Sequence, residues 1–176
     1  MRNFFLLIYL IISSVNAGKI SQHIVLTAQT QEFLLSIQNV REDYISIQFL
    51  VFSPFQGIYD MNYKMFADRL SVLYDTLLLS KKTLLKKLKP INDISEIELR
   101  FIDTLDTYVR LLGNTIVQLR YICMRLYYYS NASNYSLNEY SKDIEKWSKL
   151  YEEYKLYGNN ISARLHEFNI SVPSFN

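Results

Sequence analysis

The sequence is poor in the residues that build disulfides, metal sites and catalytic centres. Its 176 residues include one cysteine and two histidines, with only four glycines and three prolines. The single cysteine, Cys123, excludes an intramolecular disulfide, so packing must hold the fold together. We expect Cys123 to be a buried small hydrophobe, with a reactive thiol or an intermolecular bridge as the alternative.

Catalytic and metal-binding patterns are also missing. The two imidazoles, His23 and His166, have no partner at the i+4 spacing that builds a metal site on a helix. No Glu-x-x-His motif, glycine-rich phosphate loop or nucleophile elbow occurs. The pair Glu152 and Glu153 is more typical of a solvated helix face than of an acid–base dyad. We therefore expect no enzymatic activity, no metal and no cofactor.

Charge of one sign is not in excess, since 19 basic side chains face 17 acidic ones. This balance gives no strong field to recruit nucleic acid or an anionic membrane. Locally, the run KKTLLKKLK at residues 81–89 concentrates lysines. We interpret it as a solvated helix end whose cations complement the C-terminal dipole. A patch for a glycosaminoglycan or an acidic partner is the alternative.

Long apolar runs are absent after the N-terminus, so we expect no integral membrane span. The chain opens MRNFFLLIYLIISSVNA, in which a cation at Arg2 precedes an apolar run from Phe4 to Ile12. That run is well short of the roughly 18 residues that a span requires, and the pattern is typical of a secretory signal peptide. We expect a signal peptide at residues 1–17, cleavage after Ala17, and a secreted, extracellular protein with a single helical domain at 18–176.

Acceptor triplets for N-glycosylation follow the signal peptide. Together with it, they favour a glycoprotein made by a eukaryotic secretory pathway. The abundance of Ile, Asn, Lys and Tyr would suit an AT-rich genome, such as that of a parasite, an insect or a large DNA virus. The four acceptors are Asn131, Asn134, Asn160 and Asn169.

Apolar residues repeat every three or four positions, which is the period of an amphipathic helix. One stripe predicts a helix over about residues 21–52, and SPFQG at 53–57 ends it. A second stripe runs from Tyr63 to Leu88 and stops at Pro90. Polar residues away from the first stripe are Gln38, Arg41, Glu42 and Gln48.

The longest apolar pattern extends from Ile94 to Leu126, and Asp93 or Ser95 can cap its start. Its apolar face is wide, which predicts a central helix that packs against several others. At its end Tyr127, Tyr128 and Tyr129 stand in a row. A helix cannot bury all three on one face, so we expect at least one to face solvent or a partner.

The last helical pattern begins after a turn that contains two of the glycosylation acceptors. Ser136 and Glu139 have the spacing of a capping box. The apolar seam then runs from Leu137 to Phe168, and Gly158 within it suggests a bend or a close helix approach. No strand alternation occurs. The sequence therefore predicts an all-α fold, a compact bundle of four long helical segments with four to six helices in total.

Two stretches resemble the interleukin-10 family of helical cytokines. LLGNTIVQLRYICMRL at residues 111–126 is similar to that family's fourth helix, in which a Leu-Gly pair is followed by an apolar residue, Leu-Arg and a further Arg. ISARLHEFNI at 161–170 is similar to its final-helix signature, with Asn169 in place of an Asp. Weaker similarities begin at Ile37 (IQNVRED) and Phe66 (FADRLSVLYD). The matching residues are Leu112, Gly113, Ile116, Leu119, Arg120 and Arg125, then Ala163, Glu167, Phe168 and Ile170.

The resemblance implies a class II helical-cytokine fold, whose connections cross over further than those of a simple up-down-up-down bundle. It also implies a cytokine or cytokine mimic, such as a viral homologue, that binds class II cytokine receptors through the first helix, the loop after it and the last helix. The family's usual disulfides are absent, and SVPSFN ends the last helix early. The candidate contacts carried over are Gln38, Arg41, Glu42, Asp43 and Glu167.

Two other functions fit the same sequence. A secreted helical effector of unrelated lineage would bind another extracellular protein, and a carrier would enclose an apolar ligand between its helices. Large aromatic side chains in the seams argue against such a cavity. We expect a monomer or a domain-swapped dimer, because a loop at 130–136 would allow the last helices to be exchanged between copies.

Overall fold

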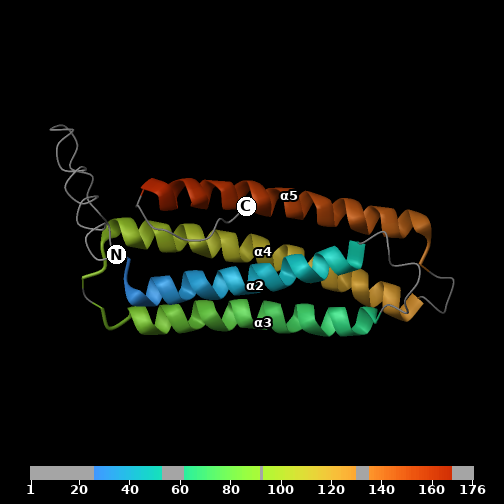
Figure 1. Cartoon of the computed structure of the whole chain (residues 1–176), viewed down its shortest axis with the longest axis horizontal. Coiled ribbons are helices and arrows are strands. Elements are labelled where there is room, and N and C mark those ends of the chain that lie inside the picture. The colour runs from blue at the N-terminus through green and yellow to red at the C-terminus, as the bar shows by residue number, and fades with distance from the viewer. Residues whose placement is uncertain (1–25, 53–61, 92, 130–134, 168–176) are drawn as a thin grey trace, which may run out of the picture.

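The computed structural model describes residues 26–52, 62–91, 93–129 and 135–167. In these ranges the chain forms four α-helices and no strand (Figure 1). The prediction of an all-α bundle of four long helical segments is confirmed. The helices are α2 (Ala28–Phe52), α3 (Tyr63–Leu88), α4 (Glu96–Tyr129) and α5 (Leu137–Glu167).

The helices alternate in direction, and each one packs against the next one in the chain (Figure 1). The connections at residues 53–62, 89–95 and 130–136 are too short for the long crossovers that the cytokine resemblance implied. The bundle is therefore of the simple up-down-up-down kind. The ion pairs that join successive helices over the described residues include Glu32–Lys87, Lys81–Asp106, Arg125–Glu139 and Arg125–Asp143.

Polar side chains begin all four described helices, as the orphan amides of a first turn require. At the start of α2, the Thr30 amide donates to the Thr27 hydroxyl at 3.3 Å. The Ser95 hydroxyl accepts a hydrogen bond from the Glu98 amide at 3.1 Å, which confirms one of the two predicted caps of α4. Ser136 and Glu139 form the predicted capping box of α5: the Glu139 amide donates to the Ser136 hydroxyl at 3.3 Å, and the Ser136 amide donates to the Glu139 carboxylate at 3.0 Å. A cap that was not predicted begins α3, where the Asn62 side chain accepts a hydrogen bond from the amide of Met65 at 2.9 Å.

The core lies along α4, which packs against α3, α5 and, more lightly, α2. Leu105, Leu112, Ile116 and Leu119 are each 0% exposed. A fully buried side chain of this size stabilises the fold by roughly 1.5–3 kcal/mol relative to an exposed one. The prediction of a central helix is confirmed, because this helix supplies a buried stripe to all its neighbours.

Several local predictions were wrong. The first helix begins at Ala28, after the non-helical Leu26 and Thr27, rather than near residue 21. Leu137, placed in the last apolar seam, is 83% exposed. There the inward position is taken by Tyr140, whose ring meets that of Tyr135 edge-on with centroids 5.9 Å apart. The bend or close helix approach at Gly158 stays a prediction, since α5 runs through this buried glycine to Glu167. The predicted signal peptide and the SPFQG stop lie outside the described residues.

Candidate protein-binding surface

The interior between α2 and α5 is filled by aromatic side chains and one arginine. The Arg41 Nε donates to the Tyr154 hydroxyl at 3.1 Å, and the Tyr108 hydroxyl donates to the same oxygen at 3.2 Å. Trp147 stacks on Tyr151 with ring centroids 5.2 Å apart. Burial raises the pKa of Tyr108 and of Tyr154, so both hydroxyls stay neutral. Hydrogen bonds and ring contacts thus link the side chains of this layer to one another.

Two of the predicted receptor contacts belong to this interior, so their placement on a solvated face was wrong. Gln38 is 5% exposed and Arg41 is 8% exposed. For Arg41 the cause is Tyr154 of α5, whose ring is large enough to reach α2 and whose hydroxyl accepts the Arg41 hydrogen bond in the interior. Long polar side chains are tolerated there because their hydrogen-bonding groups find partners.

The other predicted contacts are placed differently. Glu42 and Asp43 are exposed on α2. Glu167 is the last residue of α5, and its side chain lies outside the described part of the structure. Among the glycosylation acceptors, Asn160 is exposed on α5. The other three, Asn131, Asn134 and Asn169, lie outside the described residues.

A buried carboxylate ties the beginning of α2 to that of α4. The Glu98 side chain is 2% exposed and accepts hydrogen bonds at one oxygen from the Thr27 amide (3.0 Å), the Thr27 hydroxyl (2.7 Å) and the Thr30 hydroxyl (2.6 Å). Three protein donors converge on this one oxygen, which suits a carboxylate with a structural role. It fixes one end of the bundle.

The cysteine has no reactive surroundings. Cys123 is 0% exposed in the core, and burial raises the pKa of its thiol to about 12. Since the thiolate is the nucleophile, a thiol of this kind is inert at neutral pH. The prediction of a buried small hydrophobe is confirmed. Over the described residues, no group of three His, Cys, Asp or Glu side chains lies close enough to hold a metal ion.

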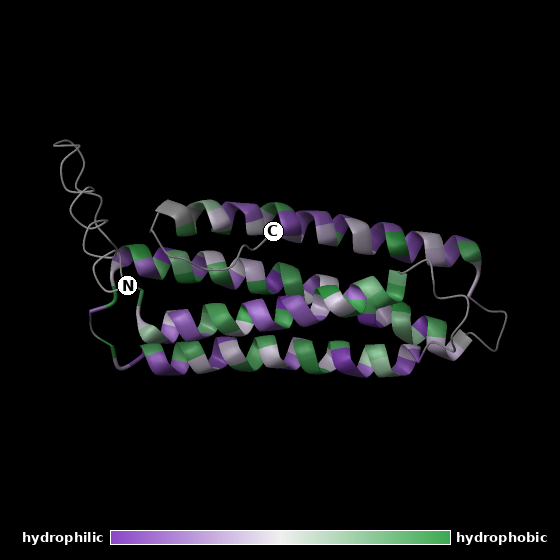
Figure 2. Ribbon diagram, viewed as in Figure 1, coloured by the Kyte–Doolittle hydropathy of each residue, from purple (hydrophilic) through white to green (hydrophobic). Residues whose placement is uncertain are grey.

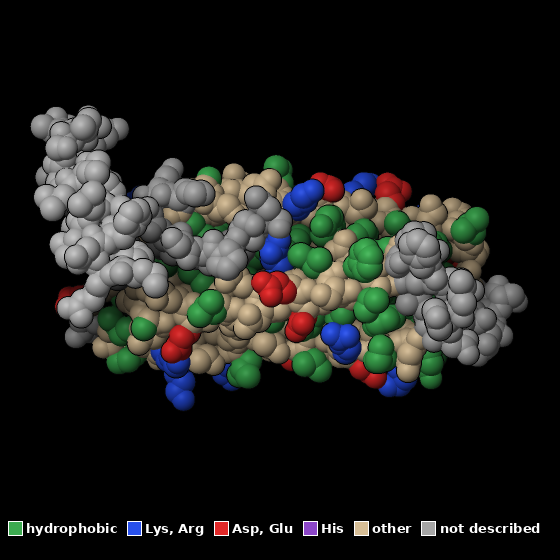
Figure 3. All heavy atoms as spheres, viewed as in Figure 1, with side chains coloured by type: hydrophobic (Ala, Val, Ile, Leu, Met, Phe, Trp, Pro, Cys, Tyr) green, Lys and Arg blue, Asp and Glu red, His purple; other side chains and the backbone are tan. Residues whose placement is uncertain are grey.

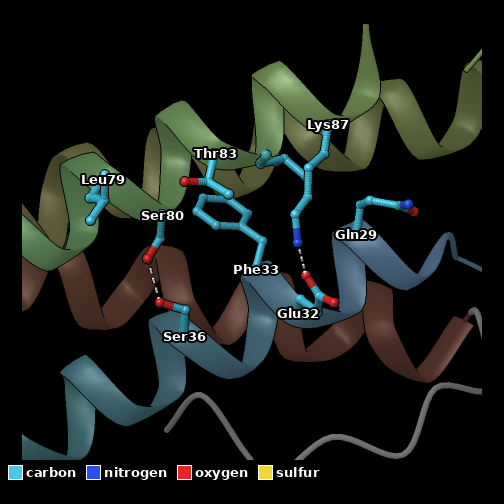
Figure 4. Close-up of a pocket in the computed structure, with 9 residues that line it drawn as sticks. Gln29, Glu32, Phe33, Ser36, Leu79, Ser80, Thr83 and Lys87 are labelled. Carbon is cyan, nitrogen blue, oxygen red and sulfur yellow. Dashed lines mark hydrogen bonds and ion pairs between the residues drawn. The ribbon is translucent and has the colours of Figure 1, made fainter. Parts of the chain in front are cut away.

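Grooves lie along both sides of α3. Figure 4 shows the one between α2 and α3, which is crossed by the hydrogen bond between Ser36 and Ser80 and by the ion pair of Glu32 with Lys87. Thr83 also lines it. Hydroxyl and charged groups at the surface make this groove unlike the enclosed apolar chamber that a carrier requires.

The outer side of α2 carries exposed apolar residues beside carboxylates. Phe49 is 70% exposed, Leu35 56%, Leu50 41% and Ile45 37%. Leu35, Glu42 and Phe49 are seven residues apart, so they share one side of the helix. Figure 2 shows a strongly hydrophobic end of α2, and Figure 3 shows hydrophobic side chains gathered over α2 and α5 on this side. We call Leu35, Glu42, Asp43, Ile45, Phe49 and Leu50 the α2 face.

The apolar part of the α2 face was not predicted, although its signal is present in the sequence. Ile45, Phe49 and Leu50 fall outside the stripe that Tyr44, Ile47 and Val51 continue, and an apolar residue off the stripe faces away from the core. Surface hydrophobes that occur singly are normal. Three exposed apolar side chains within six positions, close to the charged Glu42, are more typical of an interaction surface.

The lysine run is partly neutralised within the bundle. Lys81 pairs with Asp106, and Lys87 pairs with Glu32. The other three lysines, Lys82, Lys86 and Lys89, are exposed on α3 or just after it. Basic residues in the last turn of α3 complement the helix dipole, as the sequence suggested.

No known protein family, curated protein or solved structure matches the chain. Within the described residues, no helix combines the length and apolarity needed to cross a membrane.

Proposed function

We propose that the protein is an exported, glycosylated and non-catalytic helical bundle that acts by binding another extracellular protein through the α2 face. The observation that supports this best is Phe49, a large aromatic side chain that is 70% exposed on a helix whose other side is fully packed. An exposed Phe49 side chain adds nothing to the stability of the bundle on its own. Burial under a partner would gain roughly 1.5–3 kcal/mol for each apolar side chain covered.

The charges of the α2 face define the partner further. Glu42 and Asp43 are exposed next to the apolar residues. The expected partner surface is therefore apolar at its centre, to receive Phe49 and Leu35, and carries Lys or Arg at its rim. An aromatic anchor surrounded by polar residues is the usual composition of a binding hot spot.

The way the helices are connected favours a helical interaction protein unrelated to the class II cytokines over a member of that family. The up-down-up-down order lacks the long crossovers of that family. Two residues of the resemblance also have roles inside this bundle. Gly113 is where the Tyr74 ring approaches α4, and Arg125 pairs with Glu139 and Asp143 across α4 and α5. Class II receptors remain the first partners to test, because Glu42 and Asp43 are exposed where the resemblance places contacts.

The test begins with the chain expressed in a eukaryotic secretory system. Mass spectrometry of the secreted product should show an N-terminus after Ala17 and a glycan on Asn160. Binding is then measured against class II cytokine receptor ectodomains and a wider set of extracellular proteins. A partner is accepted only if Phe49→Ala weakens binding about ten-fold or more, and Glu42→Lys weakens it in a salt-dependent way.

A matched control is Leu156→Ala on α5, which removes an apolar side chain that is 68% exposed and lies outside the α2 face. It should leave the affinity unchanged. Retention of the chain inside the cell, or a partner whose affinity responds to Leu156→Ala and not to Phe49→Ala, would contradict the proposal. Binding to a class II receptor with the expected variant effects would restore the cytokine hypothesis.

A further inference from the structure

Three lysines near the end of α3 carry charges that the bundle does not neutralise. Of the five lysines at residues 81–89, two form the ion pairs with α2 and α4 described above. The other three are exposed, and none of the described carboxylates forms an ion pair with them. We call these three residues the lysine ridge: Lys82, Lys86 and Lys89.

The lysine ridge lies on one side of α3 and points away from the core. Its residues are four and then three positions apart, which is the spacing that aligns side chains along a helix. Lys82 and Lys86 each precede a buried leucine, Leu84 or Leu88, by two positions, which is more than half a turn. The ridge is roughly 10 Å long at the helical rise of about 1.5 Å per residue. Helix α3 forms one edge of the bundle (Figure 1), and basic side chains project from that edge in Figure 3.

The stability of α3 alone does not account for this arrangement. The helix dipole favours cations in the last turn, which contains Lys86 but not Lys82. Like charges four positions apart on a helix repel each other, and these two lysines have that spacing. No Asp or Glu occurs in the sequence between Asp75 and Asp93. A bound anion would therefore relieve a repulsion that the local sequence leaves in place.

Acidic residues on the same helix limit the shape of that anion. Asp75 and Asp68 precede Lys82 by seven and fourteen positions, so they lie on the same outer side of α3. Both are exposed. A flat anionic membrane lying along α3 would meet these aspartates as well as the lysines, and like charges would repel it. A linear polyanion can contact the last turns of α3 alone.

We propose that the lysine ridge binds a linear sulfated polysaccharide outside the cell. Sulfate oxygens accept charge-assisted hydrogen bonds from the three ammonium groups, and the release of counterions from the polyanion drives binding. This inference takes the extracellular location from the proposed function, because it is an exported protein that meets sulfated polysaccharides.

The lysine ridge and the aromatic anchor of the α2 face lie at different ends of the bundle. Ser80, just before the lysine run, is hydrogen-bonded to Ser36, so the ridge lies beside the first turns of α2. Phe49 is thirteen residues further along α2, which is roughly 20 Å. A protein held on a polysaccharide by its lysines would therefore keep Phe49 available for its protein partner.

The test is calorimetric titration of the purified full chain with a heparin oligosaccharide of defined length, at several salt concentrations. The logarithm of the affinity should fall linearly with the logarithm of the salt concentration. Changing all three ridge lysines to glutamine should weaken binding about ten-fold or more and remove most of this salt dependence. Hyaluronan, which carries no sulfate, should bind much more weakly than heparin. The variant combines Lys82→Gln, Lys86→Gln and Lys89→Gln.

The matched control changes three exposed lysines of α5, where Glu145, Glu152 and Glu153 lie among the lysines. It lowers the net charge by the same amount and should leave heparin binding unchanged. Circular dichroism checks that both variants are helical. The control combines Lys142→Gln, Lys146→Gln and Lys155→Gln.

Three results would overturn the proposal. The first is a chain that does not bind heparin at about 100 µM. The second is an equal loss of binding in the α3 and α5 variants, and the third is tighter binding to vesicles of phosphatidylserine and phosphatidylcholine than to heparin. Phe49→Ala should bind heparin as the unchanged chain does, so failure of the α2 face as a protein-binding surface would not alter this result. Secretion of a chain that ignores heparin would contradict the polysaccharide site alone.

Discussion

The indole Nε1 of Trp147 on α5 donates a hydrogen bond of 3.0 Å to the hydroxyl of Tyr44 on α2, 103 residues earlier in the chain. Tyr44 is 0% exposed and Trp147 is 9% exposed. The backbones of α2 and α5 come close to each other at few places, so large side chains fill the space between the two helices. This hydrogen bond is therefore one of the specific links that set the position of α5 relative to α2.

Removing the acceptor should weaken this link. Tyr44→Phe keeps the ring and leaves the buried Trp147 N–H without its partner. We expect the free energy of unfolding, measured by urea denaturation, to fall by about 1–3 kcal/mol. Tyr128→Phe is the control, because Tyr128 is 62% exposed, and its change should stay within about 0.5 kcal/mol. Equal losses for both variants would mean that the hydrogen bond contributes nothing specific.

Gly113 should tolerate a small side chain and reject a large one. A Cβ at this position would lie 3.2 Å from the Cε2 of Tyr74, whose half-buried ring can shift slightly. For Gly113→Ala, the gain in helix propensity of about 1 kcal/mol offsets the tight contact. Gly113→Leu should lower the free energy of unfolding by about 1–3 kcal/mol.

The double variant identifies the cause of that loss. Tyr74→Ala removes the ring and should recover part of the stability that Gly113→Leu loses. The neighbouring Asn114 is exposed, so Asn114→Leu should cost much less than Gly113→Leu. No recovery in the double variant would show that Tyr74 is not the obstacle.

Glu139 should make stability depend on pH in the acid range. Its pKa is lowered from 4.5 to about 2, first by hydrogen bonds from Ser136 and then by Arg125. Because the folded-state pKa is below the unfolded one, the stabilisation is complete above about pH 4.5 and is lost as pH falls through about 2. The difference in free energy of unfolding between the protein and Glu139→Gln should shrink across this window.

A second background tests the origin of this pH dependence. In Ser136→Ala the carboxylate loses the hydroxyl that donates to it at 2.8 Å. The same Glu139→Gln comparison should then change less with pH. A pH dependence that is equally steep in both backgrounds would assign the effect to the Ser136 backbone amide and Arg125, both of which remain in Ser136→Ala.

Loss of the buried carboxylate should loosen one end of the bundle. Glu98→Ala removes the acceptor that the Thr27 amide and the hydroxyls of Thr27 and Thr30 share, and we expect a loss of about 1–3 kcal/mol in the free energy of unfolding. Hydrogen exchange should accelerate most in the first turns of α2 and α4. Glu96→Ala is the control, since its side chain is 77% exposed, and it should have little effect.

The periodicity of apolar residues predicted the helices well, because a helix that is buried on one side needs an apolar residue at every third or fourth position. The stripe from Tyr63 to Leu88 matches α3 at both ends. Ser95 and the box of Ser136 with Glu139 were predictable for a similar reason, since a cap acts over three residues. Local interactions of this kind need no knowledge of the neighbouring helix.

Predictions that depended on the neighbouring helix were less successful. Arg41 is polar and lies off the apolar stripe, but Tyr154 lies 113 residues away and accepts its hydrogen bond in the interior. No local pattern contains that pairing. Leu137 shows the opposite case, in which an apolar residue in a regular seam lies at a helix start where nothing covers it. Long-range packing decides both positions.

The packing of each helix on its neighbour in the chain also has a consequence for how the molecule acquires its structure. Adjacent helices have only short loops to close, so the average separation of contacting residues along the chain is small. Helical proteins with such local contacts fold in microseconds to milliseconds. With its lone thiol enclosed and no disulfide pairing to search for, the chain can fold hairpin by hairpin as it is synthesised, in reducing and oxidising surroundings alike.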